Sequence, residues 1–170
     1  DGFFFRDKEV VVVGGGDSAI EEGIFLTRFA NQVQVVHRRD QLRAGEALKR
    51  RAMNNEKIDF VWDSVVEEIV GNGKVEAIRL RNLKTGDRQQ MPTDGVFIFI
   101  GHYPNSSLFK DQLKMDEKGY LTVDERFMTS VPGVFAAGEI MDPVYRQIAT
   151  SVGQGCSAAM MAERWLREHS

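Results

Sequence analysis

Three consecutive glycines followed by small residues form the first group whose spacing suggests chemistry. The β-branched residues Val11 to Val13 lead into Gly14, Gly15, Gly16, Asp17, Ser18 and Ala19, which match the pattern G-x-G-x-x-A. In this pattern the first glycine permits a tight turn, the second lets backbone amides approach a pyrophosphate, and the small last residue lets helix and strand pack closely. The pattern predicts a dinucleotide-binding site, and a plain glycine turn between a strand and a helix is the alternative.

A basic cluster begins about 24 residues after the first glycine. His37, Arg38 and Arg39 end a valine-rich segment, and Arg43 lies one helical turn further along. A site for NAD usually has an Asp or Glu at the end of this strand, where it binds the ribose hydroxyls and repels a 2′-phosphate. Here no acid occupies that place, and guanidiniums bind phosphate in fork geometry. We therefore predict NADPH as the cofactor, with a solvated basic stretch as the alternative interpretation.

The elements that must position these residues alternate along the first half of the chain. We expect strands over residues 9–13, 32–37 and 58–62, and helices over 18–30 and 46–54. This alternation predicts an α/β fold with a Rossmann-like parallel sheet. Residues 65–70, 75–82 and 88–91, separated by turn-forming residues, predict an antiparallel β-meander beside it.

The apolar run 95–100 suits a strand buried on both faces, and we expect a domain boundary directly after it, between 1–100 and 101–170. Beyond the boundary, short strands are expected over 120–123 and 134–137, and a helix over 148–167. The start of that helix is rich in glycine and alanine, which would let a flat ligand approach its backbone closely.

Composition narrows the class of protein. With 170 residues, 42% of them hydrophobic, the chain can bury a core, and a net charge of -3 does not indicate a nucleic-acid or membrane-surface partner. The sequence has no long apolar span and no signal-peptide pattern at its start, so we expect a cytoplasmic protein. The single Cys156 excludes an internal disulfide and a Cys-only metal site. We expect it to pack as a small apolar residue, and we predict no metal site.

Two further segments, together with GGGDSA and HRRDQLR, carry a family resemblance. FIFIGHYPNSSLF and VPGVFAAGEIMDPVYRQIATSVGQGCSAAMMAERWL follow them in order. At this order and spacing, the chain resembles low-molecular-weight bacterial thioredoxin reductases of the flavoprotein disulfide reductase class. The resemblance covers almost the whole chain. It implies that 1–100 is an NADPH-binding domain and that 101–170 is the C-terminal part of a FAD-binding domain.

The resemblance also implies roles for individual residues. Those of the NADPH site are Arg38, Arg39 and Arg43 on the 2′-phosphate, with His37 close to the adenosine end. Gly101 marks the return to the FAD domain, and Gly138 with Glu139 corresponds to a Gly-Asp pair whose acid bonds the ribityl chain, with a side chain one methylene longer here. Arg146 and Gln147 would lie beside the isoalloxazine ring, and the amides from Ile148 onward would face its pyrimidine edge.

Members of the family also carry parts that these 170 residues do not contain. These are a second glycine-rich motif for the FAD pyrophosphate and a Cys-x-x-Cys pair just ahead of a segment like Asp1-Gly2-Phe3-Phe4. Asp1 corresponds to the acid that serves in proton transfer. For the intact enzyme, the resemblance implies a homodimer in which NADPH transfers a hydride to FAD. The reduced flavin then passes two electrons to the Cys-x-x-Cys disulfide, and the resulting dithiol reduces thioredoxin by thiol-disulfide exchange. We expect the chain alone to bind NADPH, to have an incomplete FAD site and to lack disulfide-reductase activity.

Two alternatives remain open at this stage. A ferredoxin-NADP reductase-like flavoprotein shares the domain plan and needs no cysteines. A nucleotide-binding module without turnover would need only the first domain. The HRRxxxR stretch and the DGFF segment favour the thioredoxin reductase interpretation.

Overall fold

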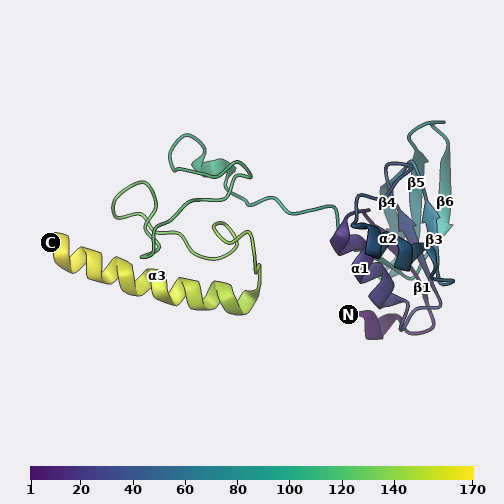
Figure 1. Cartoon of the computed structure of the whole chain (residues 1–170), viewed down its shortest axis with the longest axis horizontal. Coiled ribbons are helices and arrows are strands. Elements are labelled where there is room, and N and C mark those ends of the chain that lie inside the picture. The colour runs from purple at the N-terminus through teal and green to yellow at the C-terminus, as the bar shows by residue number, and fades with distance from the viewer. The chain divides into compact units, whose positions relative to one another are not determined.

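A computed structural model describes all residues, Asp1–Ser170, and the chain divides into two compact units. Unit 1 comprises Asp1–Gly101, and unit 2 comprises His102–Ser170. Figure 1 shows that unit 1 holds all the strands, whereas unit 2 consists of turns and loops with one long helix. The assignment of the units to NADPH and FAD stays a prediction.

Unit 1 is built on a parallel sheet of four strands in the order β3-β2-β1-β7. The strands are β1 (Glu9–Val13), β2 (Gln32–Val36), β3 (Ile58–Val61) and β7 (Gly95–Ile98). Helices α1 (Asp17–Leu26) and α2 (Glu46–Met53) form the crossovers between the first three strands. The central strand β1 pairs in parallel with β2 on one side and β7 on the other. This confirms the predicted α/β class with a Rossmann-like sheet.

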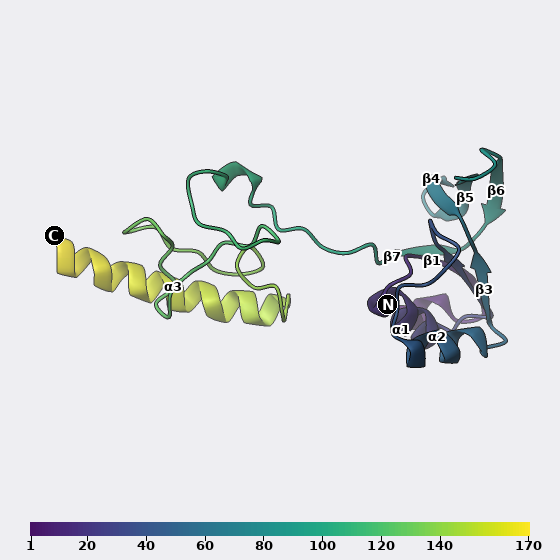
Figure 2. The same cartoon turned by 45° about the horizontal axis from the view of Figure 1, so that its top comes forward.

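The second sheet of unit 1 is an antiparallel meander in the order β4-β5-β6, as the turn residues predict. Its strands are β4 (Ser64–Gly71), β5 (Val75–Asn82) and β6 (Arg88–Pro92). In Figure 2 the helices lie on one side of the parallel sheet and the meander on the other. Val10 and Val12 of β1 pack in the helix-side core, while Val11 packs against the meander, so alternate side chains of one strand serve two cores.

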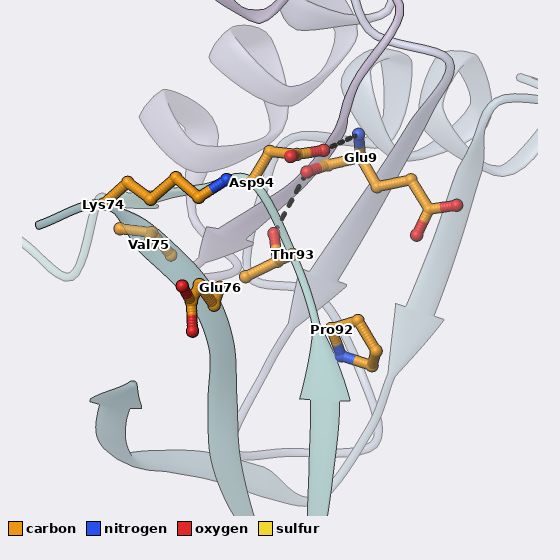
Figure 3. Close-up of a pocket in the computed structure, with 7 residues that line it drawn as sticks. All are labelled: Glu9, Lys74, Val75, Glu76, Pro92, Thr93 and Asp94. Carbon is orange, nitrogen blue, oxygen red and sulfur yellow. Dashed lines mark hydrogen bonds between the residues drawn. The ribbon is translucent and has the colours of Figure 1, made fainter. Parts of the chain in front are cut away.

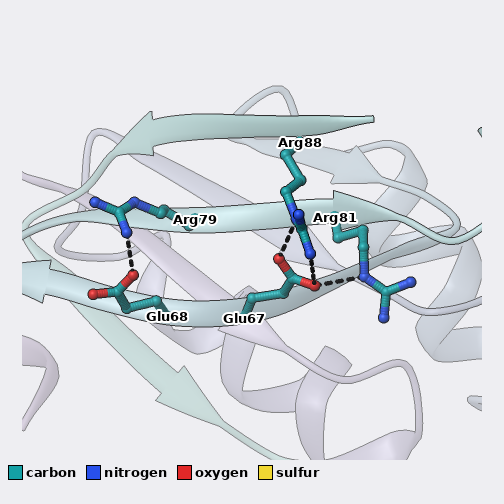
Figure 4. A network of polar contacts seen from close by, with 5 residues as sticks. All are labelled: Glu67, Glu68, Arg79, Arg81 and Arg88. Carbon is teal, nitrogen blue, oxygen red and sulfur yellow. Dashed lines mark hydrogen bonds and ion pairs between the residues drawn. The ribbon is translucent and has the colours of Figure 1, made fainter. Parts of the chain in front are cut away.

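A network of ion pairs crosses the exposed face of the meander (Figure 4). Glu67 lies at a register shift in β4, and its carboxylate contacts Arg81 on β5 and Arg88 on β6, with 2.8 Å between Glu67 Oε2 and Arg88 Nε. Glu68 pairs with Arg79. The charges of these arginines therefore have partners within the meander, although such exposed pairs contribute little to stability.

Strand β7 differs from the expectation of a strand buried on both faces. It is the edge strand of the parallel sheet, and Ile98 is 56% exposed. Ile100, just beyond the strand, is 72% exposed. The apolar run indicated a strand correctly, but a one-dimensional pattern cannot distinguish a central strand from an edge strand.

Unit 2 contains a short 3-10 helix, η2 (Ser107–Phe109), and the long helix α3 (Ile148–His169). The strands expected over 120–123 and 134–137 are wrong, because each region makes only a single bridge, Leu121 to Met115 and Phe135 to Met128. The bridge between Met128 and Phe135 is formed by two backbone bonds, from Ala136 N–H to Phe127 O at 3.0 Å and from Thr129 N–H to Val134 O at 2.8 Å, and the pairing does not extend into a strand. None of the helices combines the length and the apolar character needed to cross a membrane.

Candidate nucleotide-binding site

The glycine turn lies at the carboxyl end of β1 and is packed too closely for side chains at its first position. Gly14 has a φ of 143°, in the region that favours glycine, and a Cβ there would overlap the carbonyl oxygen of Phe99 and come within 2.8 Å of the Ala19 Cβ. The Gly14 amide donates to Val36 O of the neighbouring strand at 3.0 Å. The turn is therefore held between both adjacent strands and α1.

Gly16, in contrast, borders open space at the start of α1. A Cβ on this residue would meet no atom within 4 Å. No side chain caps the helix, and its first backbone bond runs from Ile20 N–H to Gly16 O at 3.1 Å. The amides of residues 17–19 thus have no acceptor within the helix, which is the arrangement that binds a phosphate group. These features fit a dinucleotide pyrophosphate.

Three guanidiniums lie in the loop after β2. Arg38, Arg39 and Arg43 are all exposed, and no carboxylate pairs with any of them. The one acid within this loop, Asp40, is paired with Lys84 at 3.0 Å, and that hydrogen bond lowers the pKa of Asp40. The loop therefore presents positive charge that has no partner in the chain, as an anion site requires.

The basic loop is fastened directly to the glycine turn. The carbonyl of Gly15 accepts the amides of Arg43 at 2.6 Å and of Ala44 at 3.1 Å. The carboxylate of Asp17 accepts the amide of Gly45, at the start of α2, at 2.7 Å. The glycine turn and the basic loop, which are about 24 residues apart in the sequence, therefore meet at the carboxyl ends of β1 and β2.

His37 lies beneath this site instead of on its surface. It is 6% exposed, and its Nε2 atom has no hydrogen-bond partner. Burial lowers the pKa of His37, a backbone hydrogen bond to Gln41 opposes this, and Arg39, Arg38 and Arg43 lower it further. The imidazole is thus neutral near pH 7.

Two surface hollows lie away from the glycine turn. One, of about 240 Å³, lies at the opposite end of β1, where Asp94 accepts the Glu9 amide at 3.1 Å and Thr93 donates to Glu9 O (Figure 3). The other, of about 410 Å³, is lined by Phe60 and Trp62, whose rings stack at 4.8 Å. At the glycine turn itself, Gly16 borders open space and the three arginines are exposed, so the nucleotide features lie on an open surface.

In unit 2, the residues predicted for a flavin gather around the start of α3. Gly138 has a φ of 82°, and Glu139 beside it is exposed. Arg146 has a φ of 50°, and the helix begins at Ile148 with Gln147 as its uncapped N-cap residue. The first bond of α3 is from Ser151 N–H to Gln147 O at 3.0 Å, so the amides of residues 148–150 have no acceptor within the helix.

Sequence reasoning missed the two residues that organise this region, Asp142 and Gln154. The Asp142 carboxylate accepts the amides of Val144 at 2.9 Å and Tyr145 at 3.0 Å, and these bonds lower its pKa. Gln154 donates to Asp142 Oδ2 at 3.2 Å and accepts the Gly138 amide at 2.9 Å. The Asp-Pro dipeptide was the available signal, since Asp commonly starts a turn in this way.

The remaining predicted residues lie apart from these clusters. The Asp1 side chain is exposed at the start of the 3-10 helix η1 (Gly2–Phe5) and makes no capping bond. Gly101 has a φ of 105° and ends unit 1. Cys156 is exposed, which corrects the expectation that it packs as a small apolar residue, because the side of α3 on which it lies has no covering element within unit 2.

Comparison with known proteins agrees with this arrangement. Residues 2–155 match the family described as pyridine nucleotide-disulphide oxidoreductase. A thioredoxin reductase of Streptomyces coelicolor is 52% identical over 167 residues, which cover 98% of this chain and 52% of that protein. A bifunctional thioredoxin reductase/thioredoxin of Mycobacterium leprae is 50% identical over 171 residues, covering the whole chain and 37% of that protein. The crystal structure of thioredoxin reductase from Streptococcus pyogenes superposes with a TM-score of 0.82 at 48% identity, over 99% of this chain and 55% of that one.

The fold, the glycine turn and the family match together define the class: the chain belongs to the pyridine nucleotide-disulphide oxidoreductase family. Within that family it is similar to bacterial thioredoxin reductases, as the sequence motifs predict. The chain spans about half the length of the Streptomyces coelicolor relative.

Proposed function

We propose that unit 1 is the NADPH-binding domain of a thioredoxin-reductase-type flavoprotein. The observation that carries the proposal is the meeting of two anion-binding features at one sheet edge. Uncapped amides of α1 border open space at Gly16, and the unpaired guanidiniums of Arg38, Arg39 and Arg43 lie in a loop fastened to the same turn. One feature suits a pyrophosphate, and the other suits the 2′-phosphate that distinguishes NADPH from NADH.

The chain's own residues would bind and orient the dinucleotide without acting on it chemically. The amides of residues 17–19 would donate to the pyrophosphate, and the helix dipole of α1 would add favourable potential. Arg38, Arg39 and Arg43 would hold the 2′-phosphate. NADPH supplies a hydride, and the protein sets its position.

Unit 2 is proposed to contribute part of a FAD site. Supporting observations are the uncapped amides of residues 148–150 and the exposed carboxylate of Glu139 beside the positive-φ Gly138. The apolar side chains of Ile148 and Val152 on α3 are 85% and 68% exposed. We propose that they lie on the side of this helix that faces the flavin. From the family resemblance, we further propose that Gly101 marks the return of the chain to the FAD domain and that Arg146 and Gln147 lie beside the isoalloxazine ring.

For the whole protein, we propose electron transfer from NADPH through FAD to a Cys-x-x-Cys disulfide and on to thioredoxin. The names of the similar proteins support this activity and this partner. Asp1 is proposed to serve in proton transfer near that disulfide. A homodimer and a cytoplasmic location stay predictions.

The cofactor proposal is tested by titrating the chain with NADPH and NADH. We expect a preference for NADPH of at least about tenfold, since each close ion pair in water contributes about 1 kcal/mol and three guanidiniums are available. The double variant Arg38→Ala with Arg39→Ala should remove most of this preference while leaving NADH binding unchanged. Equal affinities in the unsubstituted chain would refute the phosphate-site assignment.

The activity proposal has a separate test in which thioredoxin is the substrate. The 170 residues contain one cysteine, so they cannot form an intramolecular dithiol. We expect the purified chain to bind NADPH without reducing thioredoxin. NADPH-dependent reduction of thioredoxin by these 170 residues alone would contradict the proposed electron path.

A further inference from the structure

Gly15 is a glycine that the dinucleotide pattern does not require. In G-x-G-x-x-A it occupies the variable position between Gly14 and Gly16. Its φ lies outside the left-handed region, so any residue could adopt its backbone conformation. Something other than the turn itself must exclude a side chain here.

The neighbour that excludes a side chain is the imidazole of His37. A Cβ on Gly15 would lie 2.5 Å from His37 Nδ1, 2.6 Å from Cε1 and 2.7 Å from Cγ, which is far inside normal contact distance. The ring therefore fills the space where a side chain of residue 15 would stand. At Gly16, one residue further on, the corresponding space is empty.

The His37 ring has little freedom to move away. Its backbone is held on both sides, by donation to Val61 O at 3.0 Å and by acceptance from the Ser64 amide at 3.0 Å. The rings of His37 and Trp62 are nearly perpendicular, at 76°, with their centroids 6.4 Å apart. The ring is buried, so it acts on the site from below and does not reach the surface where a ligand would bind.

Gly15 in turn holds the basic loop. Its carbonyl accepts the amides of Arg43 and Ala44, and these bonds fix the backbone from which the Arg43 side chain extends relative to the glycine turn. A displacement of Gly15 would therefore move the phosphate-binding loop along with it. The contacts run in sequence from Trp62 through His37 and Gly15 to Arg43.

We propose that His37 and Gly15 form a positioning pair that sets the 2′-phosphate loop against the pyrophosphate turn, so that the preference for NADP over NAD depends on their contact. This rests on the proposed NADPH site. His37 is accordingly a positioning residue that braces the loop through its ring, and it does not hydrogen-bond the phosphate itself. Its neighbour Gly15 is a specificity-determining residue because its lack of a side chain permits the contact.

The test compares the affinities of the 170-residue chain for NADP⁺ and NAD⁺ by calorimetric titration. Gly15→Ala should weaken NADP⁺ by at least about tenfold and NAD⁺ by less than about threefold, because the displaced Gly15 carbonyl carries Arg43 with it. Adding His37→Ala to Gly15→Ala should recover at least about threefold of the NADP⁺ affinity, since the overlap is removed.

Gly16→Ala is the matched control. Its Cβ meets nothing in the chain, so the fold should be unaffected, but it would enter the pyrophosphate position. It should weaken NADP⁺ and NAD⁺ equally, and His37→Ala should not relieve it. Equal losses of both ligands in Gly15→Ala would overturn the positioning role.

His37→Phe separates a brace from a direct ligand. A phenyl ring keeps the contact with Gly15 but has no nitrogen, so the preference for NADP⁺ should stay within about twofold, whereas His37→Ala should reduce it at least about fivefold. A loss in His37→Phe as large as in His37→Ala would instead show that a ring nitrogen is required, either for the bond to Gln41 in the loop or for a bond to the ligand, and it would overturn the role of the ring as a brace.

Circular dichroism shows which variants fold, and if Gly15→Ala does not, the two His37 variants still decide the question. Failure of the NADPH proposal is distinguishable, because the unsubstituted chain would then show no preference at all.

Discussion

The guanidinium of Arg43 offers a clean perturbation of the proposed 2′-phosphate site. Its backbone amide is bonded to Gly15 O at 2.6 Å, and this bond does not depend on the side chain. The side chain itself is exposed and unpaired. Arg43→Ala should therefore remove one charge while the loop keeps its conformation.

The magnitude follows from exposure and charge. One pair of unit charges about 4 Å apart in water contributes about 1 kcal/mol. A phosphate monoester carries roughly −1.5 to −2 charges at neutral pH, so the loss should be about 1.5–2 kcal/mol. This corresponds to roughly a 10- to 30-fold rise in the Kd for NADP⁺. The Kd for NAD⁺, which has no 2′-phosphate, should not change.

The assay is calorimetric titration of both nucleotides at two salt concentrations. The NADP⁺ effect should shrink as salt rises, because the screening length falls from about 30 Å at 0.01 M to about 3 Å at 1 M. Arg28→Ala is the matched control. Arg28 lies past the far end of the ten-residue α1, about 15 Å from the glycine turn, and its guanidinium rests on Phe25.

Three outcomes would refute this reasoning. Arg43→Ala could weaken NAD⁺ as much as NADP⁺, Arg28→Ala could weaken NADP⁺ as much as Arg43→Ala, or the effect could be independent of salt. Each would mean that the guanidinium does not act on a 2′-phosphate through charge.

Three other perturbations test the structure of the two units. Gly133→Ala should lower the free energy of unfolding by at least about 2 kcal/mol in thermal or urea unfolding, since φ is 79° and a Cβ would lie 2.9 Å from the Trp165 ring. Gly119→Ala is the control, because its φ is 88° and its Cβ would make only ordinary contacts, and it should lower the free energy of unfolding by about 1 kcal/mol. Asp142→Asn should lower the unfolding midpoint by several degrees, because its side-chain amide N–H would face the side-chain N–H of Gln154 and two donors would meet. Adding Gln154→Glu should restore the midpoint, because its carboxylate can accept both this amide and the Gly138 N–H. No recovery would contradict the hydrogen-bond relay from Gly138 through Gln154 to Asp142. Burial lowers the pKa of His37 in the folded state, so the neutral imidazole stabilises unit 1 fully above the unfolded-state pKa near 6.5, and this stabilisation should decline as the pH falls below that value. His37→Phe should flatten this decline when unfolding is measured as a function of pH. An unchanged slope would contradict the assignment of the decline to His37.

The sequence by itself determined the elements of unit 1 closely. The glycine turn, the alternating strands and helices and the meander all follow from local chemistry, namely β-branched runs, helix-forming residues and turn residues with positive φ. Helix α3 was likewise readable from its length and composition. The class of protein followed from motifs whose order and spacing are properties of the chain alone.

What only the tertiary structure decided is which atoms meet. The pattern at residues 37–43 could not show that His37 turns inward beneath Gly15 while the arginines stay outside, because that depends on the packing of Trp62 and the backbone bonds from β3. The same limit explains the edge position of β7 and the isolated bridges of unit 2. Periodicity reports local preference, whereas burial and pairing depend on neighbours that are distant in the sequence.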